Sequence, residues 1–140
     1  MTAAAHFEAV RTLLAGGILS TRVYDVVRMN GSLPVRDNYV VLMFESSMLD
    51  DDRYMALQDV DSTARYRFDV RSVATTAAAA RLYMDTVRGR LIKQTPIVEG
   101  RVCTPIRLIP PLEEGTLRHD ADANLYHAVE SFEFWSRRAA

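Results

Sequence analysis

The fold of this chain is decided by residues 65–91, RYRFDVRSVATTAAAARLYMDTVRGRL. In its first part, Tyr66, Phe68 and Val70 alternate with charged residues, and this period of two predicts a strand with one buried face. After residue 74 the apolar residues recur at helical spacing, which predicts an amphipathic helix. The members of its apolar stripe are Ala80, Tyr83, Met84, Val87 and Leu91. A strand that runs directly into such a helix predicts a helix laid across a sheet.

The size and composition are those of one ordinary globular domain. The chain has 140 residues, of which 49% are apolar and 25% are charged, enough for a single hydrophobic core. The net charge of −1 argues against a general nucleic-acid binder. No apolar run approaches the ~20 residues of a bilayer span, and the N-terminal residues lack the basic region of a secretory signal. The single cysteine, Cys103, excludes an internal disulfide and fits a reducing cytoplasm.

The remaining elements come from the same patterns. A first helix is predicted over residues 2–15, with an apolar stripe of Phe7, Val10, Leu13 and Leu14, and it ends at Gly16-Gly17. Further strands are predicted at residues 21–27, 39–44, 101–109 and 125–135. Pro105 places the strand 101–109 at an edge or a bulge.

The most apolar run is residues 39–44, YVVLMF. Because it does not alternate, we expect a strand covered on both faces. The helix at 77–91 is expected over one face, and either the first helix or a neighbouring subunit over the other. The predicted fold class is therefore α+β: a mostly antiparallel sheet of about four to five strands packed against two helices, in the order α-β-β-loop-β-α-β-β. One domain covers residues 1–140.

A long irregular connection lies at residues 46–64. A loop of this length in a small domain is usually functional or disordered. Its notable residues are Asp50, Asp51, Asp52, Arg53, Tyr54, Met55 and Leu57. The isolated apolar side chains favour an interaction loop covered by a partner, and the alternative is a partly helical surface loop.

The sequence predicts no catalytic site, no cofactor and no metal. The histidines, His6, His119 and His127, stand beside no recognisable nucleophile motif. Cys103 lies among apolar residues and is expected to be inert. A calcium loop starting at Asp50 fails because Met55 stands where the tight turn needs glycine. We therefore expect a protein that is not an enzyme.

A row of charged residues lies on the second face of the strand at 65–71. Its members are Arg65, Arg67, Asp69 and Arg71. One interpretation is a solvated sheet face, which is common in antiparallel sheets. The other is a subunit interface or a channel wall, where polar groups of a ring meet.

Several phrases, together with the order of elements, resemble the tail terminator (tail completion) proteins of long-tailed, siphovirus-type bacteriophages. The phrases are YVVL at 39–42, YRFDVRSV at 66–73, DTVRGRL at 85–91, RHDAD at 118–122 and LYHA at 125–128. The resemblance runs from the first helix to Phe134, and residues 46–64 match least. It implies a small α+β domain that assembles as a homo-hexameric ring.

The resemblance also implies a role. Such a ring caps the head-proximal end of the tail tube, ends tube polymerisation and joins the tail to the head connector. The implied partners are further copies of the chain, the tail tube protein, the connector protein and DNA that passes through the lumen without specific binding. The implied location is the virion, after assembly in the host cytoplasm, with no membrane contact.

In such a ring the charged row is the candidate subunit interface, and the seven loop residues named above are candidate contacts to a partner or to the lumen. Two alternatives stay open. The first is another phage neck or head-completion ring protein. The second is a small α+β ligand-binding domain or enzyme, which would have a deep pocket with convergent polar groups.

Overall fold

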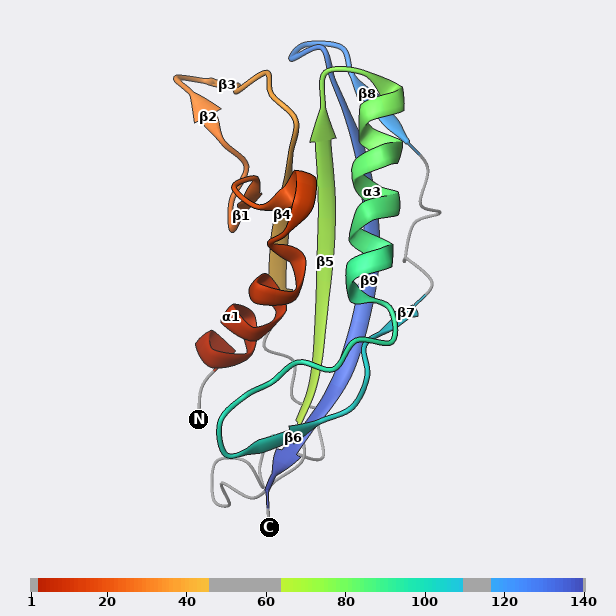
Figure 1. Ribbon diagram of the computed structural model, residues 1–140. Helices are drawn as coiled ribbons and strands as arrows, with labels where there is room; N and C mark the ends of the chain where they lie inside the picture. The colour runs from red at the N-terminus through yellow and green to blue at the C-terminus, as the bar shows by residue number, and fades with distance from the viewer. Residues whose placement is uncertain (1–2, 46–63, 110–116, 140) are drawn as a thin grey trace.

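The computed structural model describes residues 3–45, 64–109 and 117–139, and it shows a sheet with two α-helices on one face (Figure 1). The elements are α1 (Ala3–Leu14), the 3-10 helix η1 (Gly17–Leu19), β1 (Val23–Tyr24), β2 (Met29–Asn30), β3 (Leu33–Pro34), β4 (Tyr39–Glu45), β5 (Ala64–Ala74), α3 (Ala77–Leu91), β6 (Arg101–Cys103), β7 (Arg107–Ile109), β8 (Arg118–Asp120) and β9 (Leu125–Arg138). The predicted α+β class is confirmed.

The sheet is built around two long neighbouring strands, β5 and β9. Across the sheet the order is β1-β4-β5-β9-β6, and β7 and β8 also pair with β9. The sheet is therefore five strands wide. The total of seven strands arises because three short strands, β6, β7 and β8, share the outer edge of β9. Every pair is antiparallel except β1 with β4, which is parallel.

Local sequence patterns predicted only some of the short strands. The predicted strand at 101–109 divides into β6 and β7 on the edge of β9, with Pro105 in the break. Only Val23–Tyr24 of the predicted strand at 21–27 is a strand, and it is followed by a separate two-stranded hairpin, β2–β3. Neither that hairpin nor β8 was predicted. Gly31, at the turn of the hairpin, has a φ of 66°, which favours glycine.

The strand and helix at residues 65–91 form as predicted. The buried residues of α3 are the five members of the predicted stripe. Thr76 caps the helix, because its hydroxyl oxygen accepts a hydrogen bond of 3.1 Å from the backbone N–H of Ala79. Below the helix, the ring of Phe68 stacks on Phe132 of β9, with centroids 5.5 Å apart. The main core thus lies between the helices and β5–β9.

Strand β4 is covered on both faces, as predicted, but one of the covering elements differs from the prediction. Val40 and Leu42 belong to the same core as Val10 and Leu14 of α1, whereas α3 packs on β5 and β9. The expectation that α3 covers β4 was wrong, because β5 pairs with β9 and α3 returns across that pair (Figure 1). A second cluster covers the other face of β4. It consists of Tyr39, Val41, Val73, Ala123 and Leu125.

Candidate functional site

The predicted charged row lies on the sheet face opposite the helices. Along β5 the buried residues Tyr66, Phe68 and Val70 belong to the main core, and the charged residues between them are half-buried on the outer face. Residues that oppose each other in adjacent strands share a face. Glu133 of β9 opposes Arg67, and Ser131 opposes Asp69. The structure therefore brings Arg65, Arg67, Asp69 and Arg71 together and adds residues of β9 that the sequence interpretation missed.

Glu133 anchors one end of this outer face. Its side chain is only 4% exposed, although it points away from the main core. Arg107 of β7 donates a hydrogen bond of 2.5 Å from Nε to Oε1 of Glu133, and Nη1 of Arg65 lies 3.7 Å from Oε2. One carboxylate thus joins three strands, and it neutralises part of the charge of two arginines within the subunit.

The other three members of the row have different surroundings. Asp69 accepts a hydrogen bond of 2.6 Å from the hydroxyl of Ser131. Arg67 lies in register between Glu45 of β4 and Glu133 of β9. Arg71 opposes Val41 on one side and Val129 on the other. Within the described part of the chain, the Nε of Arg71 is buried and has no hydrogen-bond partner.

A second buried carboxylate lies on the helix side of the sheet. In β9 the residues that share the core face include Phe132 and Phe134, and Glu130 interrupts this apolar pattern. The structure explains the interruption, since Glu130 is 7% exposed and pairs with Arg88 of α3. Arg88 also lies 3.3 Å from Asp85. The pair therefore fixes α3 on the sheet.

The predicted loop contacts fall outside the described residues. They are Asp50, Asp51, Asp52, Arg53, Tyr54, Met55 and Leu57.

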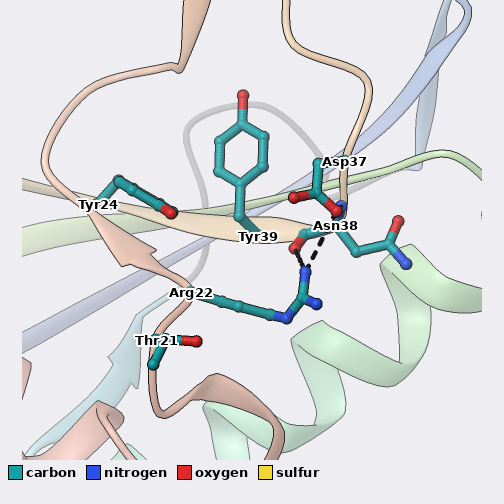
Figure 2. Close-up of a pocket in the computed structure, with 6 residues that line it drawn as sticks. All are labelled: Thr21, Arg22, Tyr24, Asp37, Asn38 and Tyr39. Atoms are coloured by element: carbon teal, nitrogen blue, oxygen red, sulfur yellow. Dashed lines mark hydrogen bonds and ion pairs between the residues drawn. The ribbon is translucent and has the colours of Figure 1, made fainter.

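A small hollow lies beside the start of β4 (Figure 2). Its lining consists of Thr21, Arg22, Tyr24, Asp37, Asn38 and Tyr39. It encloses about 150 Å³, below the roughly 300–1,000 Å³ of typical ligand pockets. Figure 2 shows Arg22 pointing at Asp37 and at the backbone of Asn38. The distances are 3.2 Å to Oδ1 of Asp37 and 2.7 Å to the carbonyl oxygen of Asn38.

The residues around this hollow are best explained as a clamp, which here means the set of contacts made by Arg22, Arg28, Asp37 and Asn38 that holds the β2–β3 hairpin. Arg28, just before β2, lies 3.3 Å from Oδ2 of Asp37 and 4.9 Å from the ring centroid of Tyr24. On the far side, the amide oxygen of Asn38 accepts a hydrogen bond of 2.9 Å from the backbone N–H of Thr75. The clamp therefore joins the hairpin to β4 and to the turn before α3.

The clamp is expected to weaken in acid. The pKa of Asp37 is below its ordinary value, first because its carboxylate accepts a hydrogen bond from the backbone N–H of Asn38, and then because of Arg22 and Arg28. A lowered pKa in the folded state adds stability above the unfolded pKa of about 4, and that stability is lost as the pH falls through the folded value. The Asp37→Asn variant should be less stable than wild type at pH 7. In denaturant melts from pH 7 to 2.5 the difference should shrink, and a constant difference would contradict this account.

His6 and Cys103 are explained by packing within the subunit. His6 is fully buried, its ring lies 4.1 Å from that of Tyr66, and its Nε2 is 2.8 Å from Oγ of Ser136. Because Ser136 is also fully buried, this pair joins α1 to the end of β9 rather than facing a substrate. The sequence analysis did not predict this burial of His6. Burial raises the pKa of the Cys103 thiol, which keeps it protonated and unreactive.

In residues 3–45, 64–109 and 117–139, no group of three or more His, Cys, Asp or Glu side chains is placed to hold a metal ion. None of the helices in these same ranges has the length and apolar character needed to cross a bilayer.

Comparisons with known proteins bear on the fold. No family model matches the sequence, and no curated protein matches it. Among solved structures, this chain is similar to a chain in the virion of a native gene transfer agent particle, with a TM-score of 0.71 and 18% identity, covering 96% of each chain. The two chains share one fold. This protein therefore has, along nearly its whole length, the fold of a chain found in a virion.

Proposed function

We propose that this protein is a structural virion protein that forms a ring on the head-proximal end of a phage tail tube. In this role it ends tube polymerisation and joins the tail to the head connector. The observation that carries the proposal is the shared fold with a virion chain over 96% of both lengths. The phrases that resemble tail terminator proteins run through β4, β5, α3, β8 and β9, which are the elements that build this fold.

The described surface supports a role based on contacts. A closed ring needs two different patches on each subunit, one for each neighbour. The outer sheet face supplies a polar surface on rigid strands, and it lies apart from the helix-covered core. Ion pairs on such a surface set register and specificity more than affinity. The charged row is accordingly proposed as a contact between ring neighbours or as part of the channel wall, and the ring is a homo-hexamer.

The remaining proposed contacts follow from the ring. The acidic and apolar residues of the loop at 46–64 meet the tube protein, the connector or the lumen. DNA passes through the lumen without specific binding, in line with the net charge of −1. The protein works in the virion after assembly in the host cytoplasm. This role requires contact surfaces and no catalytic group or cofactor.

Tube growth gives a direct test of function. The purified protein is added in substoichiometric amounts to polymerising tail tube protein, and light scattering follows the growth. We expect growth to stop early because each capped end is removed from the reaction. Unchanged growth kinetics would contradict a terminator role.

The acidic loop cluster is expected to matter for joining the tail. Asp50, Asp51 and Asp52 changed together to Asn should lower the yield of joined particles by on the order of tenfold, because charge complementarity guides docking. The thermal unfolding temperature should stay unchanged. Three exposed acids elsewhere, Asp25, Glu99 and Asp122, changed together to their amides give a control with the same charge change. Normal joining by the loop variant would remove this loop from the proposed contacts.

A second candidate is another phage neck or head-completion ring protein. The shared fold favours it equally, because the similar chain is described only as part of a virion. Binding to the head connector with no effect on tube growth would favour this candidate. A ligand-binding domain or an enzyme is the third class, and it would need a deeper pocket than the hollow beside β4.

A further inference from the structure

Arg71 differs from the other charged residues of the outer face. Arg65 is near Glu133, Asp69 is bonded to Ser131, and Arg67 lies in register between two glutamates. Arg71 instead has a valine on either side. Its side chain makes no hydrogen bond or ion pair with the residues that the structure describes, and its Nε is buried. The Nε of Arg65 is buried too, but Arg65 lies near the carboxylate of Glu133. A buried donor without a partner is unfavourable, so such groups are usually paired.

We use the word corner for the part of the outer face that holds Arg71 and His127. This corner holds a second unsatisfied nitrogen. His127 lies on the same face, opposite Val73, and its Nδ1 is also buried without a partner among the described residues. The pKa of His127 is lowered, first by burial and then by the charge of Arg71, and Asp120 opposes this only partly. This part of the outer face therefore combines the positive charge of Arg71 with two buried nitrogens that have no hydrogen-bond partner among the described residues.

We propose that Arg71 receives a carboxylate from a second copy of this chain and is the main electrostatic anchor of the contact between ring neighbours. The proposal rests on the ring proposed above, and it identifies which residue of the charged row matters most. An arginine that lies between apolar side chains is a frequent hot spot of protein interfaces. A carboxylate accepts two parallel hydrogen bonds from a guanidinium, so one acid would satisfy the charge and the donors together.

A second copy fits this corner better than nucleic acid does. Phosphate-binding surfaces gather several exposed arginines and lysines, whereas the neighbours of Arg71 in register are Val41 and Val129. Val41 is 1% exposed, so the guanidinium lies at the border of a packed cluster. The whole chain has 18 acidic residues against 17 basic ones, so a basic corner leaves a larger excess of acid elsewhere to complement it.

The test compares Arg71→Ala with Arg67→Ala in the full chain. Both variants remove one arginine from the same strand face, so they share the change in net charge. Sedimentation velocity measures self-association, and electron microscopy counts rings on tail tubes. We expect Arg71→Ala to weaken association by about tenfold or more, the size of a hot-spot loss. Arg67→Ala also removes a residue of the charged row, but it should weaken association clearly less, because Arg67 lies in register between two glutamates. Equal effects of the two variants would overturn the proposal.

The pKa of His127, measured by NMR, gives a readout that a merely structural role would not move. In wild type it should rise on assembly, because the arriving carboxylate offsets the charge of Arg71. No such rise should occur in Arg71→Ala. A pKa that is unaffected by assembly would overturn the proposal, as would duplex DNA binding that Arg71→Ala abolishes and Arg67→Ala does not.

Rings that form equally well in Arg71→Ala would refute this inference alone. Association through Arg71 that never caps a tube would refute the proposed function alone.

Discussion

Replacing Phe68 with alanine is expected to lower the free energy of unfolding by about 3–5 kcal/mol. Phe68 is fully buried at the centre of β5. Its ring stacks on Phe132 at 5.5 Å and meets Phe134 edge-on at 6.2 Å. The change removes apolar contacts and leaves a cavity where the two long strands meet, and the surrounding aromatic rings can fill it only in part.

Urea denaturation followed by circular dichroism measures this loss. Leu82→Ala is the matched control, because Leu82 is 57% exposed and its truncation should change stability by only about 0.5 kcal/mol or less. A Phe68→Ala variant that loses less than about 1 kcal/mol would show that the core does not lie between the helices and the β5–β9 pair.

The second large effect is expected at Glu133, where the Glu133→Ala variant should lose about 2–3 kcal/mol. The side chain of Glu133 is 4% exposed and lies between Arg65 and Arg107. Its removal takes away the acceptor of the Nε hydrogen bond of Arg107 and the carboxylate that lies 3.7 Å from Nη1 of Arg65. The variant should reduce protection against hydrogen exchange more in the edge strand β7, whose Arg107 donates to this carboxylate, than in β4.

The Glu133→Gln variant separates charge from shape. Its amide oxygen can still accept from Nε of Arg107, so it should lose clearly less stability than the alanine variant. The difference between the two losses should also persist in 0.5 M salt, because a nearly buried acceptor is screened weakly. Equal losses in Glu133→Gln and Glu133→Ala would assign the effect to charge alone.

Local periodicity was enough to predict the framework of the fold. The alternation of β5 and the stripe of α3 are properties of nearby residues, and both formed as expected. The break at Pro105 is likewise local, because proline cannot donate to a strand ladder. The chemistry of each segment was sufficient in these cases.

What sequence did not predict depends on pairs far apart in the chain. Glu133 meets Arg65 and Arg107 only through the register of three strands, and a register is set by the whole sheet. The burial of His6 depends on Ser136, 130 residues away. The covering of β4 by α1 likewise depends on tertiary packing. The alternation of residues 130–136 indicates that Glu133 lies on the face opposite Phe132 and Phe134, but it does not identify Arg65 and Arg107 as its partners.

Cryo-electron microscopy of the purified protein mixed with tail tube protein would show directly whether a ring forms on the head-proximal end of the tube. We expect rings of about six subunits on one end of each tube, with the two helices and the sheet of each subunit recognisable in the density. A protein that stays monomeric beside open tubes, or that binds along their sides, would contradict this expectation.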